Sequence, residues 1–239
     1  MRDLSPAARI AARTAAIVVA AGSSRRMAGQ DKILASLRGR PVLWYSLRAL
    51  TAAGVRSIVL VAPAARRDEF ERLCDQEAWP KVTRVVAGGD RRQDSVRAGL
   101  DAADADGVAD WILVHDGARP LITPDAIVRG LLTAADRGSA VAAVPVKDTI
   151  KVVAGDGRVL ETPPRSALWA VQTPQIFRAD LFRRAHAGVA EDVTDDAALV
   201  EALGEPVYLY EGSYENLKVT TPDDLSLADV LLSRRETES

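Results

Sequence analysis

The chain has 239 residues, of which 48% are hydrophobic, and a formal net charge of -2. This length allows one large domain with a substantial core, and the nearly balanced charge argues against a nucleic-acid-binding surface. The sequence contains no membrane-spanning run, no secretory signal and a single cysteine, Cys74. We therefore expect a cytoplasmic protein with no membrane contact, no disulfide and no thiolate metal site.

Apolar β-like runs alternate with amphipathic helical stretches along most of the chain. Residues 1–14 precede this pattern, and we expect them to be a disordered extension. The strand-like runs lie at 17–20, 57–62, 82–89, 111–116 and 140–146. Helical patterns lie at 42–53, 64–77 and 94–103, and another begins at Thr123 and Pro124. This rhythm predicts one α/β domain over 15–235, with helices on both faces of a mostly parallel sheet.

The rhythm breaks at residues 147–172. Two short β-like runs flank the turn at 155–157, which predicts a hairpin or an extended arm. The segment has too little apolar surface for its own core but enough β-branched residues to pair with an identical neighbour, so we expect a dimerisation arm. A self-contained hairpin is the alternative. Beyond it the sequence predicts helices near 179–186 and 195–203, a strand at 207–210, and a last helix from Pro222.

The most informative motif is the stretch 15–32, in which a strand-like run breaks into a turn of small residues followed by cations. The small residues at 20–22 let a ligand approach the backbone closely, and Ser24 adds a donor. Arg26 and Lys32 supply positive charge for phosphate oxygens. The pattern favours a nucleoside triphosphate over an ordinary turn with solvated arginines. Residues required for a Walker A loop or a dinucleotide fingerprint are absent.

Two more motifs follow strand-like runs. In the first, Gly89 permits close backbone approach, Asp90 offers an acceptor to a ribose or a base, and Ser95 begins a helix. A plain β-turn with a Ser cap is the alternative. In the second, Asp116 ends a strand, where a carboxylate holds a divalent cation directly or through water. Its neighbour His115 is more simply a packed, hydrogen-bonded residue. Strand-end motifs meet at one edge of such a sheet.

Seven motifs in order make the chain resemble the 2-C-methyl-D-erythritol 4-phosphate cytidylyltransferase family over about 15–232. They are AAG-SSRRM...K, GGDRRQDSV, VHDGARP, PVKDTIK, ALWAVQTPQ, TDDAALVE and NLKVTTPDD. The resemblance implies a Rossmann-like nucleotidyltransferase sandwich with a protruding β-arm. It implies transfer of CMP from CTP to methylerythritol phosphate with Mg²⁺, releasing pyrophosphate, in non-mevalonate isoprenoid biosynthesis. It also implies a homodimer in which each arm, 147–172, completes the neighbouring site.

The resemblance assigns roles to individual residues. It implies that the nucleotide contacts Ala20, Ala21, Gly22, Ser24, Gly89, Asp90, Ser95 and Gly117. It implies that the residues acting at the reacting phosphates are Arg26, Lys32, Lys218 and Asp116, and that Asp116 is the metal ligand. It implies that the acceptor is bound by Arg119, Thr149, Arg165, Thr173 and Thr194. Gly117 stands where alanine is common in the family, a change whose effect we expect to be slight.

The chemistry implied needs no protein nucleophile, because an ionised phosphate of the acceptor attacks the α-phosphorus of CTP. Three alternatives stay open at this point. The acceptor could be ribitol 5-phosphate, the chain could be a nucleotidyltransferase for another base or acceptor, or it could be a nucleotide-binding regulator without catalysis. Retention of Arg26, Lys32, Asp116 and Lys218 argues against the last.

Overall fold

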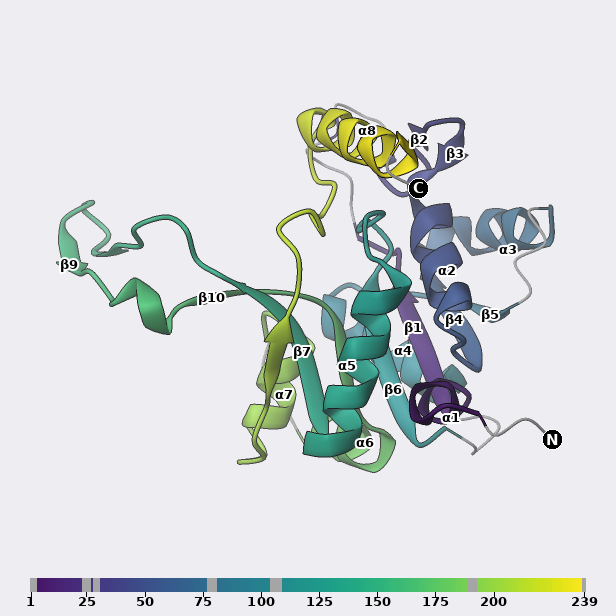
Figure 1. The fold of residues 1–239 in the computed structure, drawn as a ribbon, viewed down its shortest axis with the longest axis horizontal. Helices are drawn as coiled ribbons and strands as arrows, with labels where there is room; N and C mark the ends of the chain where they lie inside the picture. The colour runs from purple at the N-terminus through teal and green to yellow at the C-terminus, as the bar shows by residue number, and fades with distance from the viewer. Residues whose placement is uncertain are drawn as a thin grey trace.

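The computed structural model describes residues 4–22, 27, 31–76, 81–103, 109–188 and 193–237. Its centre is a seven-stranded sheet in the order β11-β7-β10-β6-β1-β4-β5 (Figure 1). The strands are β1 (Thr14–Val19), β4 (Ser57–Ala62), β5 (Val82–Ala87), β6 (Trp111–Asp116), β7 (Ser139–Pro145), β10 (Trp169–Arg178) and β11 (Leu209–Glu211). All neighbours are parallel except β10, which runs antiparallel to β6 and β7. The predicted mostly parallel α/β sheet is therefore confirmed.

Helices cover both faces of this sheet because the side chains of each strand alternate between two cores. In β1, Ala16 and Val18 face one core, and Ala15 and Ile17 face the other. The helices of the first core are α1 (Pro6–Ala11), α2 (Val42–Ala52), α3 (Arg67–Gln76) and α5 (Pro124–Arg137). Those of the second are α4 (Arg92–Ala103), α6 (Ala179–Gly188) and α7 (Asp196–Glu201).

A smaller third core lies above the strand ends. Helix α8 (Pro222–Thr237) packs there on the hairpin of β2 (Ser36–Leu37) and β3 (Arg40–Pro41), which the sequence did not indicate. The predicted start of α8 is confirmed, since the Asp224 carboxylate accepts from the amides of Thr220 and Thr221, each at 2.8 Å. Among the described helices, none is long and apolar enough to cross a membrane.

The arm leaves the sheet as an extension of β7 and β10 (Figure 1). It carries the antiparallel pair β8 (Val152–Val153) and β9 (Val159–Glu161), so the predicted hairpin is confirmed. Strand β10 was not predicted. Its first three residues are exposed on the arm, the next six are buried in the sheet, and its register shifts between Val171 and Gln175. Such a strand shows neither regular alternation nor a continuous apolar run.

The N-terminal segment also differs from the expectation of disorder. Residues 6–11 form α1, whose amide at Ala8 donates to the Ser5 hydroxyl at 3.2 Å, and Thr14 already belongs to β1. Ala11 is buried in the first core and its carbonyl accepts from the Arg56 amide at 3.1 Å. Disorder is therefore wrong for residues 4–14, because α1 packs against α5. Residues 1–3 lie outside the described part of the chain.

Cys74 and both histidines of the chain are buried titratable groups. Burial raises the pKa of Cys74 to about 12, so the thiol is an inert packing group, as the sequence predicts. The ring of His186 stacks edge-on against Phe182 at 4.5 Å between centroids, and burial lowers its pKa to about 4. His115 of β6 is also buried, with its pKa lowered to about 4. Both imidazoles are therefore neutral at pH 7.

We expect the free energy of unfolding to fall between pH 7.5 and pH 5. The unfolded chain takes up protons near the ordinary histidine pKa of about 6.5, while the folded chain resists uptake until about pH 4. Each histidine should then contribute a loss of about 2 kcal/mol over this interval. Urea unfolding of the parent and of His186→Leu at both pH values measures this. The pH-dependent loss should be about 2 kcal/mol smaller in the variant; an equal loss would contradict the assignment.

Candidate functional site

Two adjoining cavities open at the carboxyl ends of the central strands. The first, which we call the glycine cavity, has a volume of about 420 Å³ and is lined by Gly22, Lys32, Gly89 and Ser95. The second, the threonine cavity, has about 430 Å³ and is lined by Arg119, Thr173 and Thr194. The residues that line both are Arg92, Asp116 and Lys218. The two cavities therefore meet around one carboxylate.

The glycine cavity depends on close contact between the turns after β1 and β5. A Cβ on Gly88 would lie 2.4 Å from Ala21 Cβ and 2.8 Å from Ser95 Oγ, so only glycine allows this approach. The Ser95 hydroxyl then accepts from the Gly89 amide at 3.2 Å. Asp90 is exposed at the cavity wall. The two strand-end motifs are thus brought together as predicted.

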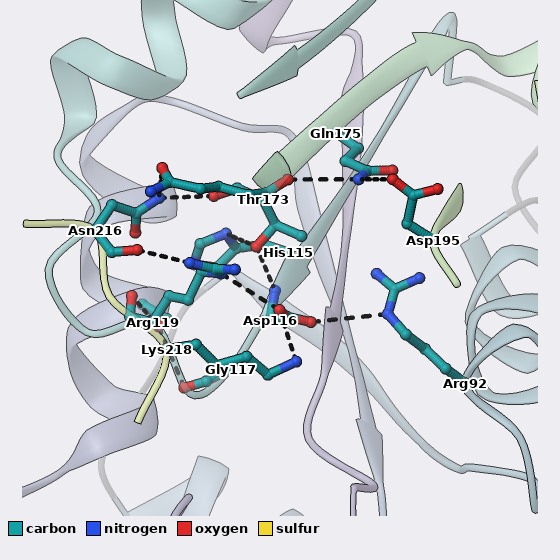
Figure 2. Close-up of polar contacts among 12 residues, drawn as sticks. Arg92, His115, Asp116, Gly117, Arg119, Thr173, Gln175, Asp195, Asn216 and Lys218 are labelled. Carbon is teal, nitrogen blue, oxygen red and sulfur yellow. Dashed lines mark hydrogen bonds and ion pairs between the residues drawn. The ribbon is translucent and has the colours of Figure 1, made fainter. Parts of the chain in front are cut away.

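Asp116 is the centre of the site. Its Oδ2 lies 3.0 Å from Lys218 Nζ and 3.4 Å from Arg119 Nε, and its Oδ1 lies 3.9 Å from Arg92 Nε (Figure 2). Burial alone would raise the pKa of this carboxyl, but Lys218, Arg92 and Arg119 outweigh that cost and hold the pKa well below its usual range. The group is therefore an anion that already orders three cations.

Arg92 is a member of this site that the sequence analysis left without a role. It begins α4, and its Nη2 lies 2.7 Å from Oδ2 of Asp196, which is buried at the start of α7. Its neighbour Arg91 instead pairs with Asp94 on the surface at 2.8 Å. Nothing in the local sequence distinguishes these adjacent arginines, because the partners of Arg92 come from distant segments.

Thr173 forms hydrogen bonds with both Asp116 and His115. The Asp116 amide donates to Thr173 Oγ1 at 3.0 Å, and the same oxygen lies 3.1 Å from His115 Nδ1 (Figure 2). His115 is fully buried and neutral. It is thus the packed, hydrogen-bonded residue that the sequence predicts. Thr173 reaches the site because the register shift of β10 lets residues 172–174 leave the ladder with β7.

Asn216 is a second residue that the sequence analysis missed. Its Nδ2 donates to the carbonyl of Thr173 at 2.9 Å and to Oε1 of Gln172 at 3.1 Å. Its own carbonyl accepts from Arg119 Nη1 at 2.6 Å (Figure 2). Asn216 therefore ties the segment that carries Lys218, two residues further on, to both β10 and Arg119. The motif NLKVTTPDD contains it, but its partners are remote in sequence.

The structure brings most of the predicted residues to these cavities. Those at the glycine cavity are Ala21, Gly22, Lys32, Gly89, Asp90, Ser95, Asp116 and Lys218. Those at the threonine cavity are Arg119, Thr173 and Thr194 together with the shared Asp116 and Lys218. Ala20 is buried behind the first turn, where its amide donates to the Val61 carbonyl at 2.8 Å. Arg26 and Ser24 lie outside the described residues.

Gly117, for which a nucleotide contact is predicted, lies outside both cavities. Its amide donates to the Val19 carbonyl at 3.0 Å, its carbonyl accepts from Ser46 Oγ at 3.3 Å, and it lines neither cavity. A Cβ at this position would lie 3.0 Å from Leu43 Cδ1. Packing against α2 therefore accounts for a small residue here, and the added methyl of alanine would need a small shift of Leu43.

Thr149 and Arg165 lie on the arm, where both are exposed and neither lines the glycine cavity or the threonine cavity. Arg165 Nη1 donates to the Lys147 carbonyl at 2.8 Å. Among the described residues, no group of three or more acidic, histidine or cysteine side chains could hold a metal ion. Asp116 is the carboxylate that both cavities share, while Asp90 lines only the glycine cavity and Asp195 only the threonine cavity.

Comparisons with known proteins agree on one family. The family model IspD, described as 2-C-methyl-D-erythritol 4-phosphate cytidylyltransferase, matches residues 14–234. The chain is 48% identical over 223 residues to the protein of that name from Dehalococcoides mccartyi strain CBDB1, covering 93% of this chain and 97% of that one. It is 44% identical over 230 residues to the Pelotomaculum thermopropionicum protein, covering 94% and 96%.

Solved structures give the same result. The 4-diphosphocytidyl-2C-methyl-D-erythritol synthase of Anaerococcus prevotii superposes with a TM-score of 0.80 at 29% identity, covering 92% of this chain and 98% of that one. The 2-C-methyl-D-erythritol 4-phosphate cytidylyltransferase of Thermus thermophilus superposes with a TM-score of 0.73 at 33% identity, covering 91% and 98%.

We expect Asn216→Ala to lower the free energy of unfolding by about 2 kcal/mol or more, because it leaves two buried acceptors, on Thr173 and Gln172, without a donor. Urea denaturation measures this. Ser213→Ala is the matched control from the same loop, since it removes only one exposed hydrogen bond, from the Glu215 amide. Its cost should stay below about 0.5 kcal/mol. Equal losses in the two variants would contradict the central place of Asn216.

Proposed function

This chain belongs to the 2-C-methyl-D-erythritol 4-phosphate cytidylyltransferase family, and we propose that the glycine cavity is its CTP site and the threonine cavity its acceptor site. The chain is a nucleotidyltransferase of isoprenoid biosynthesis, which transfers CMP from CTP to 2-C-methyl-D-erythritol 4-phosphate. One observation carries the assignment of the cavities. They meet at Asp116 and Lys218, and in this reaction the α-phosphate of CTP must meet the phosphate of the acceptor.

On the nucleotide side, the turn at Ala21 and Gly22 approaches the triphosphate, and Lys32 supplies charge at the same wall. The exposed Asp90 accepts from a ribose hydroxyl or from the cytosine amine. Arg26 joins the triphosphate contacts on the strength of the family pattern. A cytosine-binding acceptor of this kind would be left unpaired by uracil, which favours CTP over UTP.

On the acceptor side, a phosphate oxygen attacks the α-phosphorus in line with the departing pyrophosphate. That phosphate has a second pKa of about 6 and is largely ionised at pH 7, so it needs no general base. His115 agrees with this, because it is buried, neutral and turned to Thr173. The chain's contribution is positioning and charge stabilisation. Lys218 and Arg92 are the cations at the junction, and Arg119 adds a third on the acceptor side; all three are paired with Asp116.

The residues present also fit a divalent cation brought in with the triphosphate. Mg²⁺ is commonly held by one or two carboxylates together with substrate phosphates, and Asp116 is one buried, ionised carboxylate at the place where those phosphates would lie. We propose that Asp116 holds the cation directly or through water. When bound, the cation would offset negative charge on the phosphate oxygens as pyrophosphate leaves.

Phosphorus NMR tests the reaction with purified protein, CTP, Mg²⁺ and methylerythritol phosphate. The expected result is a diphosphodiester signal together with pyrophosphate, both absent without the acceptor. Replacing CTP by UTP, or the acceptor by ribitol 5-phosphate, should slow the reaction strongly. Equal rates with ribitol 5-phosphate would reassign the threonine cavity, and binding of CTP without turnover would contradict the proposal.

Lys218→Met should lower kcat by at least about tenfold and change KM for CTP much less. A charge-assisted contact to the α-phosphate becomes stronger as charge develops in the transition state, so its loss acts on the chemical step. Steady-state kinetics at saturating acceptor measures this. Lys81→Met is the control, since Lys81 lies at the opposite end of the sheet, just before β5. An effect on KM alone would contradict the placement of Lys218.

We also propose that the chain acts as a homodimer through residues 147–172. The arm carries three apolar side chains that are about half exposed, Val152, Val153 and Leu160. Thr149 and Arg165 lie on that arm away from both cavities of their own chain, so they fit contacts to an acceptor bound by a neighbour. The planar guanidinium of Arg165 suits bidentate recognition of a phosphate.

Mixing two inactive variants tests sharing of sites. If Arg165 acts across the dimer, a heterodimer of Arg165→Ala and Lys32→Ala chains holds one site with both groups intact. After subunit exchange of an equal mixture, half of the dimers are heterodimers, so about a quarter of all sites should be active. If Arg165 serves its own chain, every site lacks one group. The mixture should then stay inactive, as each variant does alone.

A further inference from the structure

A third cavity lies between α5, β11 and α8, on the other side of Asn216 from the threonine cavity. This cavity, which we call the α5/α8 cavity, has a volume of about 640 Å³ and exceeds both cavities of the active site. Leu121 and Leu231 form part of an apolar wall, and the loop after β11 closes one side. The proposed reaction uses none of these groups, although Asn216 contacts Thr173 and Arg119 of the active site.

Asn216 lines this cavity, and its side chain has a buried acceptor without a partner among the described residues. Gln172 Nε2 donates to the Ser213 carbonyl at 2.9 Å, which turns Gln172 Oε1 toward Asn216 Nδ2. The same Nδ2 donates to the Thr173 carbonyl, so the orientation of the Asn216 amide is determined by its partners. Asn216 is only 2% exposed, yet its Oδ1 has no hydrogen-bond partner among the described residues. A buried acceptor of this kind requires a donor.

Tyr210 also lines this cavity, and its side chain has a second buried group without a partner among the residues that the structure describes. The residue is 8% exposed, and its phenolic oxygen has no partner within the described part of the chain. The ring reaches α5 at Gly130, where a Cβ would lie 2.8 Å from the phenolic oxygen. A glycine in the middle of α5 lowers helix propensity but leaves room for this phenol. Burial raises the pKa of Tyr210, so it stays protonated and can donate or accept.

The charged side chains at the cavity favour an anion. Arg235 is paired with Glu215 at 2.7 Å and donates to the Leu121 carbonyl at 2.9 Å. The other charged residues that line the cavity are Arg129, Arg234 and Glu211. Both of these arginines are exposed. Arg129 makes one long hydrogen bond, 3.4 Å, to the Glu211 carbonyl. A ligand's anionic group therefore has two arginines available at the mouth of the cavity.

We propose that the α5/α8 cavity binds a small anionic alcohol, whose hydroxyl donates to Asn216 Oδ1 and whose anionic group lies at Arg129 and Arg234. Tyr210 supplies a second hydrogen bond inside, and the apolar wall contacts the carbon chain. Asn216 connects this ligand to the reacting centre, because its other polar groups hold Thr173 and Arg119. A molecule bound here would thus affect the position of the segment that carries Lys218 without entering the active site.

Calorimetric titration of the full chain with glycerol 3-phosphate tests the site. Glycerol, which has only the hydroxyl groups, and inorganic phosphate, which has only the anionic group, are the comparison probes. Glycerol 3-phosphate should bind more tightly than either. Arg129→Gln and Tyr210→Phe should each weaken it by about tenfold or more, since a charge-assisted or buried hydrogen bond is lost. Arg137→Gln, from the same helix but not at the cavity, should change the affinity by less than about twofold.

Two further variants keep the result interpretable. Thr194→Ala alters the acceptor site, and a loss of binding in this variant but not in Tyr210→Phe would place the probe in the threonine cavity and overturn the proposal. Urea unfolding of unliganded Tyr210→Phe should show equal or greater stability than the parent, because an unpartnered hydroxyl is removed. A large loss of stability would mean that the hydroxyl is already satisfied and would overturn the proposal. Absence of saturable binding would leave only water in the cavity and would also overturn it.

Discussion

The arrangement of this protein's site depends on one buried carboxylate. Asp116 ends the central strand β6 and is only 6% exposed, so its charge would be costly without compensation. Lys218, Arg119 and Arg92 provide that compensation from three different parts of the chain. A single anion therefore gathers the cations that a nucleotidyltransferase needs, and it does so before any phosphate arrives. We regard this preorganisation as the basis of the proposed catalysis.

The second constraint is the antiparallel strand β10. It lies between β6 and β7 in the sheet and continues outward into the arm, so one strand serves both the site and the proposed dimer contact (Figure 1). Its register shift frees Gln172 and Thr173 from regular pairing, and Asn216 takes up the acceptors that this exposes. The same asparagine lines the α5/α8 cavity and donates to the Thr173 carbonyl in the active site, so it connects the two.

The alternation of apolar and polar residues was sufficient to predict most of the fold. Strands β4 and β6 have the predicted bounds, and α5 and α8 begin at the predicted Pro124 and Pro222. These features depend on neighbours in sequence, through side-chain alternation and helix capping. Glycine and charge at the strand ends predicted the glycine cavity for the same local reason. Helix α1 was not predicted because its stability comes from packing on α5 rather than from a long apolar run.

The sequence by itself determined the family, the α/β class and most of the residues that line the two cavities, because those depend on motifs whose chemistry is local. Tertiary structure alone decided which polar groups meet. It separated Arg92, which joins Asp116 to Asp196, from the surface residue Arg91. It also placed Gly117 against Leu43 and outside both cavities, and it brought Asn216 to Thr173 and to the wall of a further cavity. These pairings join residues far apart in the chain, and they form only when the sheet, with β10 inserted in it, brings those segments together.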